Sequence, residues 1–404
     1  MGCMWAGADN EARRMLWRSV GVNGEEVVGG GGRSLVGAAP DPEAVPFVGE
    51  AGRVGEPSGA RAQLGYLPEL DGLRGVAALM VVLFHVSEAI LFMPYRGRLL
   101  TPVLRATELG FFGVDIFFAL SGFLITRGLL ARAREQRFYR NFYVRRVLRL
   151  VPPYLLTLLL VGFAIPGSGR YLGLSAVYLA NMSPWFGVAM AYPVLWSLSV
   201  EEHFYLVWPW LVRRCSRSGL LVLCAALCLV IPTARVVEAV HGGLNIFLSW
   251  NRFDGLAWGA IAALLLRNEK ALRRFARSAG VGAVVVFAVA LVVALRGSKY
   301  GGVSLIYSSG AMCSTCVIGL VAGGARIGVL RWRPLRFCGD VSYWVYLIHP
   351  LALILLLRFP RAVHPGLGTW VWLASGTLGL SLATGALVRR FVEEPALSLK
   401  KYFA

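Results

Sequence analysis

The sequence predicts an all-α, polytopic membrane protein with about ten transmembrane helices and both termini in the cytoplasm. Its 404 residues are 57% hydrophobic and only 16% charged, whereas soluble domains are about 45–50% apolar and about 25% charged. The apolar residues are also gathered into runs of roughly 18–22 residues, each long enough to cross about 30 Å of hydrocarbon. This composition excludes a cytosolic enzyme and a secreted, disulfide-bonded scaffold.

The first part of the chain differs from everything after it. Residues 1–65 are rich in Gly, Ala, Glu and Arg, include four glycines in a row at 29–32, and show no sustained periodicity. A segment of this composition cannot bury enough apolar surface to fold. We therefore expect a disordered cytoplasmic N-terminal extension over 1–65, a membrane domain over 66–395 and a short cytoplasmic tail over 396–404.

Ten apolar runs define the predicted membrane domain. They cover residues 73–93, 108–130, 147–165, 194–212, 219–235, 246–266, 279–295, 303–325, 341–357 and 369–388. One further segment, 171–190, is ambiguous because it is moderately apolar but is interrupted by Gly173, Asn181, Pro184 and Gly187.

Positive charge in the loops decides the topology, since cytoplasmic loops carry an excess of Arg and Lys. With 171–190 left out, the loops after the second, fourth, sixth and eighth spans and the C-terminal tail are basic, and the first and third loops are poorer in basic residues. Counting 171–190 as a span would invert every later loop. The net charge of +19 is thus explained by membrane orientation, and we expect no nucleic-acid partner.

The seven cysteines indicate neither disulfides nor a metal centre. Cys224, Cys228, Cys313 and Cys316 lie inside apolar runs, where a reduced and packed thiol is expected. Cys313 and Cys316 lack both the βαβ context of a redox motif and the second pair of a zinc site. No metal site is predicted.

The stretch from Leu73 to His85 in the first span contains two ionisable residues, which cost at least about 2.5–3.5 kcal/mol each on insertion scales and are therefore candidates for function. Arg74 and His85 are eleven residues apart, which brings them within about 20° of the same helix face and separates them by roughly 16 Å. Arg74 is expected at the cytoplasmic rim and His85 near the middle of the membrane. The structural alternatives are a snorkelling arginine and a histidine bonded to a neighbouring helix.

His85 is the candidate general base, because it is the only side chain of its span that exchanges a proton near neutral pH and a base is needed to activate a hydroxyl nucleophile. Under the predicted topology, four acids fall in the outer half of their spans and are candidate partners of His85: Asp115, Glu201, Glu202 and Asp254. Two structural roles stay open, an ion pair of Asp254 with Arg252 and a helix cap at Asp115.

Arginines cluster where the chain enters the third span. Arg146 and Arg149 are three residues apart and share a helix face, and Arg145 is adjacent to them. Paired guanidiniums at the membrane boundary suit a phosphate or pyrophosphate, which arginine binds bidentately. The alternative is ordinary positive charge on the cytoplasmic side.

Together these residues resemble the integral-membrane acyltransferase 3 family over roughly residues 66–395. Six segments carry the resemblance: Leu70–Gly75 with His85, similar to an Arg-x10-His signature; Phe117–Leu124, similar to a Ser-Gly-Phe motif; Arg146–Arg149, similar to an Arg-x-x-Arg element; Trp196–Tyr205; Arg252–Asp254; and Ser342–Pro350. His203 departs from the pattern, since glutamine is more usual there.

The resemblance implies transfer of an acyl group, by default acetyl, from cytoplasmic acyl-CoA to a hydroxyl of a sugar or glycosylated acceptor at a bacterial cytoplasmic membrane. It implies His85 as the general base, with Glu201 as the carboxylate that orients it and with Arg74 and Asp254 in the catalytic group. Acyl-CoA, a co-substrate rather than a bound cofactor, would contact Arg145, Arg146, Arg149 and Ser121.

Two other functions stay open at this point. Intramembrane Asp, Glu and His residues and Gly-rich spans also suit a proton-coupled transporter or exporter, although no internal repeat relates the two halves of the chain. A glycan ligase with a lipid-linked saccharide donor is the third possibility, and it would leave the arginine cluster without a ligand.

Overall fold

The structure, a computed structural model, describes residues 65–91, 100–295, 299–359 and 366–402. Within these ranges every regular element is a helix and no strand occurs, which confirms the all-α class. The predicted disordered extension lies outside the described residues except for Gly65. The described part of the predicted tail, residues 396–402, is helical: it holds the end of the helix Glu394–Ser398 and the turn Leu399–Tyr402.

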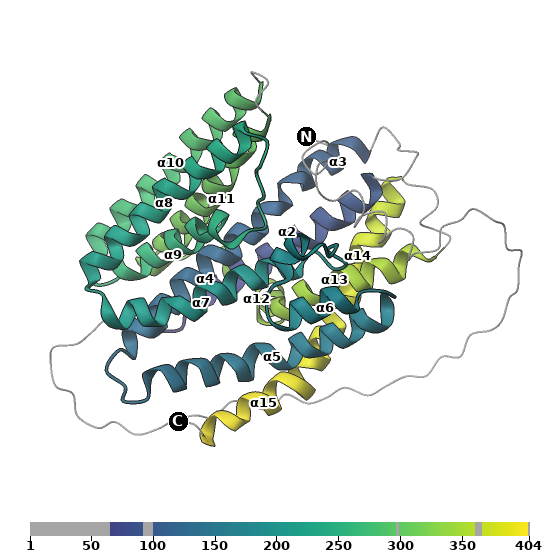
Figure 1. Ribbon diagram of the computed structural model, residues 1–404, viewed down its shortest axis with the longest axis horizontal. Helices are drawn as coiled ribbons and strands as arrows, with labels where there is room; N and C mark the ends of the chain where they lie inside the picture. Colours follow the sequence, from purple (N-terminus) through teal and green to yellow (C-terminus); the bar gives the residue numbers. More distant parts are fainter. Residues whose placement is uncertain (1–64, 92–99, 296–298, 360–365, 403–404) are drawn as a thin grey trace, which may run out of the picture.

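The main helices, in chain order, are α2 (Pro68–Leu91), α3 (Leu100–Thr107), α4 (Phe112–Ala131), α5 (Phe138–Ala164), α6 (Gly169–Ala176), α7 (Leu195–Arg214), α8 (Arg217–Val240), α9 (Phe253–Leu265), α10 (Glu269–Leu295), α11 (Lys299–Ala322), α12 (Arg333–Asp340), α13 (Ser342–Leu357), α14 (Leu367–Val388) and α15 (Glu394–Ser398) (Figure 1). Short 3₁₀ or π turns join some of them: η1 (Glu108–Phe111), η2 (Ala180–Phe186), η3 (Ser249–Asn251), η4 (Gly328–Arg331), η6 (Arg389–Glu393) and η7 (Leu399–Tyr402).

Several of these helices are long and apolar enough to cross a membrane, as expected of a multi-pass membrane protein. In the described part of the chain there are seven such segments: Pro68–Leu91, Leu100–Ala131, Phe138–Ala164, Arg217–Val240, Glu269–Val293, Ser304–Ala322 and Leu367–Ser398. An eighth is formed if α12 and α13, which meet at a bend of 78°, count as one broken span.

The predicted count of ten spans also included α7 and α9. A helix occupies each of these places, but α7 contains Glu201, Glu202 and two terminal arginines and is too polar for a span by composition, and α9 has 13 residues. The ambiguous segment 171–190 holds most of the eight-residue α6 and the short turn η2. Its omission from the predicted spans therefore agrees with the helix lengths.

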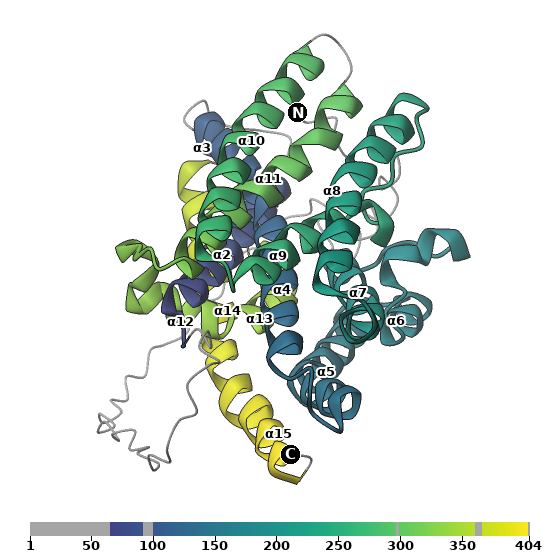
Figure 2. The same ribbon diagram turned by 90° about the vertical axis from the view of Figure 1, so that its left-hand side faces the viewer.

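The helices form two groups that meet at α4. Helices α8, α10 and α11 pack together with α9 on one side, and α2, α12, α13 and α14 pack on the other (Figures 1 and 2). Helix α4 touches α2 in one group and α9 and α11 in the other. It packs very closely against α9: a Cβ at Gly122 of α4 would clash with the carbonyl oxygen of Leu256, and a Cβ at Gly259 of α9 would clash with that of Ala119. These glycines fix the position of the neighbouring Ser121.

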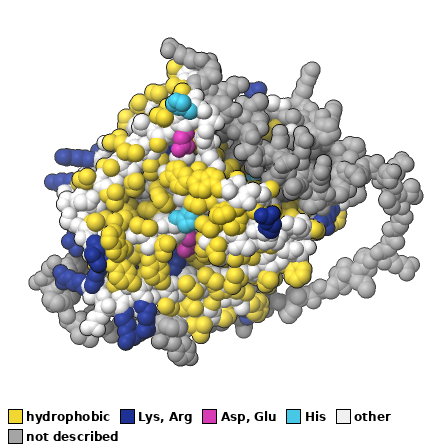
Figure 3. All heavy atoms as spheres, viewed as in Figure 1, with side chains coloured by type: hydrophobic (Ala, Val, Ile, Leu, Met, Phe, Trp, Pro, Cys, Tyr) yellow, Lys and Arg dark blue, Asp and Glu magenta, His cyan; other side chains and the backbone are white. Residues whose placement is uncertain are grey.

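Large apolar side chains cover the outside of the helix bundle. Phe163 on α5, Leu229 on α8 and Val284 on α10 are 87%, 72% and 70% exposed. On the face shown in Figure 3 hydrophobic side chains dominate the described surface, and several Lys and Arg side chains gather toward its lower left edge. An outer surface of this kind is suited to lipid, since a soluble protein rarely exposes apolar patches so extensive.

Candidate active site

A pocket of about 230 Å³ lies between α2, α4, α5, α7 and α13. It brings together five of the predicted site residues from four helices: Arg74, Ser121, Arg146, Arg149 and Glu201. The rest of the lining is largely apolar and aromatic: Val114, Phe117, Phe118, Leu120, Leu124, Ile125, Leu150, Ser197, Leu198, Tyr205, Ser342, Tyr343 and Tyr346.

The charges that line the pocket are three guanidiniums and one carboxylate. Arg74 comes from α2, and Arg146 and Arg149 come from consecutive turns of α5, so the two positions that share a helix face also share the pocket. The side chain of Arg149 is exposed, which opens the arginine end of the pocket to the outside. Because the walls are apolar and lower the local dielectric constant, this excess of positive charge attracts anions strongly.

Arg146 is held by an aromatic ring. Its guanidinium carbon lies 3.3 Å from the centroid of the Tyr205 ring, and its Nε lies 3.9 Å from Oε1 of Glu202. This Nε is buried and has no hydrogen-bond partner among the described residues. Stacking on Tyr205 fixes the plane of the guanidinium, so its donor edge is pre-oriented for a ligand oxygen.

Arg145, the third predicted arginine, is not in the pocket lining. Its Nη2 lies 3.5 Å from Oε2 of Glu135 in the loop before α5. A hydrogen bond from Asn141, together with the nearby Arg145, lowers the pKa of the Glu135 carboxyl. Glu135 therefore stays ionised, and its carboxylate balances the positive charge of Arg145.

Glu201 joins α7 to α4 at the pocket. Its Oε1 accepts a hydrogen bond of 2.8 Å from Ser121 Oγ on α4, and its Oε2 accepts one of 2.9 Å from the Tyr205 hydroxyl one turn later on α7. Each carboxylate oxygen therefore has a hydroxyl donor. Two residues that the sequence assigned to different roles, Ser121 and Glu201, are direct partners.

His85 contacts a second histidine. Its Nδ1 lies 2.9 Å from the carbonyl oxygen of Val81 and 3.3 Å from Nε2 of His349 on α13. The two ring centroids are 4.9 Å apart. His85 lies outside the pocket lining, but Tyr346, which is in that lining, has its ring 5.9 Å from that of His349. The pair thus lies next to the Tyr346 end of the pocket.

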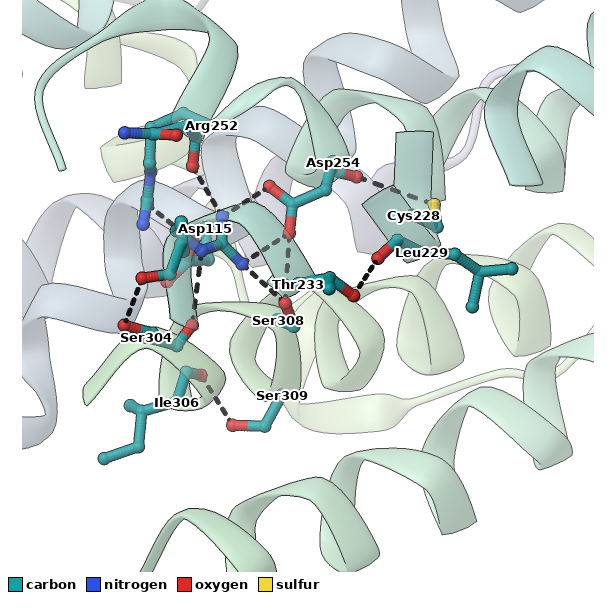
Figure 4. A network of polar contacts seen from close by, with 12 residues as sticks. Asp115, Cys228, Leu229, Thr233, Arg252, Asp254, Ser304, Ile306, Ser308 and Ser309 are labelled. Atoms are coloured by element: carbon teal, nitrogen blue, oxygen red, sulfur yellow. Dashed lines mark hydrogen bonds and ion pairs between the residues drawn. The ribbon is translucent and has the colours of Figure 1, made fainter. Parts of the chain in front are cut away.

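The acids expected to meet His85 have other partners. Asp254 accepts hydrogen bonds of 2.8 and 2.7 Å from the two terminal nitrogens of Arg235 on α8 and one of 3.0 Å from Ser308 on α11 (Figure 4). Asp115 accepts one of 2.7 Å from Arg252. All four charged side chains are at least 96% buried, and their contacts tie α4, α8, α9 and α11 together.

Asp254 therefore belongs to an ion-pair network between helices, and its suggested partner Arg252 binds Asp115 instead. Asp115 lies in the first turn of α4 but makes this ion pair rather than a cap. Arg235 is a residue that the sequence reasoning missed. Its position at the end of an apolar run could have identified it, because a charged residue in a membrane span usually pairs with a residue of opposite charge.

Three tyrosines at the pocket were also missed: Tyr205, Tyr343 and Tyr346. Tyr205 holds Arg146 and Glu201, and the Tyr346 hydroxyl lies 2.6 Å from Oγ of Ser197. Tyr343 and Tyr346 are three residues apart on α13, the spacing that puts two side chains on one helix face, and that spacing was the available signal. His203 lies outside the pocket lining, with its Nδ1 2.6 Å from Oγ of Ser249.

Known proteins resemble the chain over the same region. Residues 67–388 match a family model described as an acyltransferase domain of the acyltransferase 3 family. YrhL of Bacillus subtilis, provisionally named a peptidoglycan O-acetyltransferase, is 28% identical over 72% of this chain and 49% of its own length. Peptidoglycan O-acetyltransferase OatA of Listeria monocytogenes is 26% identical over 82% of this chain and 56% of its own length.

The chain thus spans about half the length of the curated relatives that it matches. No solved structure matches it significantly. The family match covers most of the chain, including every residue that lines the pocket and the histidine pair. The chain therefore belongs to the acyltransferase 3 family.

Proposed function

We propose that this protein transfers an acyl group, by default acetyl, from acyl-CoA to a hydroxyl of a carbohydrate acceptor. The observation that carries the proposal is the pocket whose lining combines Arg74, Arg146 and Arg149 with the hydrogen-bonded pair Ser121 and Glu201. Acyl-CoA combines phosphates with a long and largely uncharged pantetheine arm. An opening rich in guanidiniums and a largely apolar interior suit these two parts.

The phosphates of CoA bind at the open arginine end in this proposal. Arg146 offers a donor edge that Tyr205 already holds in place, and Arg149 lies one turn away on α5. Arginine suits phosphate oxygens because it donates two parallel hydrogen bonds to them. The pantetheine arm then runs between α4, α7 and α13 past Phe117 toward Tyr346, which brings the thioester to the histidine pair.

The reaction is a direct acyl transfer with His85 as the general base. The acceptor hydroxyl oxygen attacks the thioester carbonyl carbon while its proton moves to Nε2 of His85. The carbon–sulfur bond then breaks, and the CoA thiolate takes the proton back from His85 to leave as free thiol. Base catalysis of this kind contributes about 10²- to 10⁴-fold to a rate.

The other predicted site residues support this chemistry in different ways. Glu201 keeps Ser121 and Tyr205 in place and offsets part of the arginine charge. Asp254, held by Arg235, acts through the position of its helices and not on the substrate.

The acceptor we propose is a polysaccharide of the bacterial cell envelope, with peptidoglycan the first to test, because both relatives are named for peptidoglycan O-acetylation. We further propose that α7 and α9 complete ten passes through the cytoplasmic membrane with both termini inside. In that orientation the arginine-rich start of α5 faces cytoplasmic acyl-CoA.

The test is turnover by the purified full chain in detergent, using radiolabelled acetyl-CoA with and without peptidoglycan fragments. The wild type should transfer label to the fragments, and His85→Ala should lose about 10²-fold or more of that rate while staying folded. A wild type that binds and consumes no acetyl-CoA would contradict the proposal and favour the transporter alternative.

A further inference from the structure

His85 and His349 come from helices far apart in sequence and meet in the interior. His349 is completely buried, and its Nε2 lies 3.3 Å from Nδ1 of His85. Each histidine also has Nδ1 near the carbonyl oxygen of the residue four positions earlier on its helix, at 2.9 Å for Val81 and at 3.2 Å for Val345. In both histidines, therefore, Nδ1 faces a main-chain carbonyl oxygen of the same helix.

These contacts determine where the hydrogens lie. A carbonyl oxygen only accepts hydrogen bonds, so the Nδ1 atom that faces it must carry the hydrogen in both histidines. A neutral His349 with hydrogen on Nδ1 has a lone pair on Nε2. The Nδ1–H of His85 is consequently shared between the oxygen of Val81 and Nε2 of His349, and Nε2 of His85 keeps the free lone pair.

We propose that His349 is a positioning residue that holds His85 with Nε2 unprotonated and ready to accept a proton. The inference rests on the proposed function, in which that nitrogen takes the proton of the acceptor hydroxyl. When it does, His85 becomes an imidazolium whose Nδ1–H already has two acceptors. A base oriented through its second ring nitrogen in this way is the logic of catalytic triads, here with a neutral ring in place of a carboxylate.

The surroundings of His349 keep it in place. Tyr346 lies one turn earlier on α13, with its ring 5.9 Å from that of His349, and the hydroxyl of Tyr192 donates a hydrogen bond of 2.7 Å to the carbonyl of Leu347. On α2 the ring of Phe84 meets that of His85 edge-on at 5.2 Å. The bond from Tyr192 thus holds α13 just before His349, and Phe84 packs against the ring that His349 contacts.

A neutral partner also suits this location. An unpaired buried carboxylate costs far more to desolvate than a neutral imidazole, and the four acids expected near His85 contact other groups: Asp115 contacts Arg252, Asp254 contacts Arg235, Glu201 contacts Ser121 and Tyr205, and Glu202 contacts Arg146.

The first test compares two substitutions of His349 in acetyl transfer. His349→Leu removes the acceptor and should lower kcat by about 10²-fold with KM for acetyl-CoA within twofold of wild type. His349→Gln retains an acceptor oxygen and should restore most of the rate. Leu353→Ala, in a buried position one turn along α13, is the packing control and should lower stability while leaving kcat close to wild type.

The second test does not depend on activity. In protein labelled with ¹⁵N-histidine, the His85 signals, assigned by their loss in His85→Asn, should show a protonated Nδ1 and an unprotonated Nε2. In His349→Leu this preference should weaken. A wild-type His85 protonated on Nε2, or a His349→Leu variant with normal kcat, would overturn the inference. If the wild type transfers no acyl group, the proposed function fails, and the ¹⁵N shifts still decide whether His349 positions His85.

Discussion

Ser121 on α4 donates a hydrogen bond of 2.8 Å to Glu201 on α7, and this contact joins the two helices at the lining of the pocket. Ser121 precedes Gly122, whose lack of a side chain allows α4 to approach α9. Glu201 also accepts from Tyr205, which carries the guanidinium of Arg146 on its ring. One short network therefore connects helix packing to the arginines that we assign to acyl-CoA.

Glu201→Gln should reduce kcat/KM about tenfold, because one of two hydrogen bonds to a charged group is lost and such bonds contribute about 1.5–3 kcal/mol. Steady-state acetyl transfer measures the effect. The matched control is Glu202→Gln, whose carboxylate contacts Arg146 at 3.9 Å but lies outside the pocket lining, and it should change the rate less than twofold. Equal rates for Glu201→Gln and wild type would refute the role of this contact.

Asp254→Asn should destabilise the protein by about 3–5 kcal/mol, the usual effect of removing one partner of a buried ion pair. Arg235→Met should do the same, and the double variant Arg235→Met/Asp254→Leu should recover part of the loss. Thermal unfolding in detergent, followed by tryptophan fluorescence, measures this as Tm. An Asp254→Asn variant with normal Tm but no activity would contradict this structural role and indicate that Asp254 takes part in the reaction.

Gly122→Ala should destabilise the protein by about 1–3 kcal/mol, because an added methyl group has no room between α4 and α9. Gly128→Ala is the control on the same helix, since the nearest atom to a Cβ there is Nη1 of Arg132 at 3.6 Å. That change should be neutral or stabilising, as alanine favours helix over glycine by about 1 kcal/mol. Equal Tm values for both variants would contradict the close packing described for α4 and α9.

Much of the fold could be predicted because it is local in sequence. Apolar runs and their flanking arginines predicted a helix at each of ten places, and those helices are present. The 20-residue α7 and the 13-residue α9 show the limit: a helix is present at both places, but neither meets the length and apolar composition of a span by itself, so the count of ten spans stays a prediction. Where each helix begins and ends depends on how the helices pack together, and a hydropathy pattern carries no information about that packing.

The partners of the site residues could be predicted only in part. Arg74, Arg146 and Arg149 were predicted as site residues because an arginine in or beside a membrane span is costly and is therefore a candidate for function. The contact of His85 with His349 spans 264 positions, and it exists because α2 and α13 lie side by side, which no local pattern encodes. For the same reason the sequence offered His85 or, as the structural alternative, Arg252 as the partner of Asp254, whereas the fold brings Asp254 to Arg235 on a different helix.

The central claim is that the arginine-lined pocket binds the phosphates of acyl-CoA, and direct measurement of CoA affinity tests it most simply. Isothermal titration of CoA into purified protein should give a Kd about tenfold weaker for Arg146→Ala and for Arg149→Ala, a loss of about 1.4 kcal/mol each. Arg145→Ala, which removes an arginine paired with Glu135 outside the pocket lining, should bind CoA as the wild type does. Equal affinities in all four proteins, or a larger loss in Arg145→Ala than in the other two, would contradict the account.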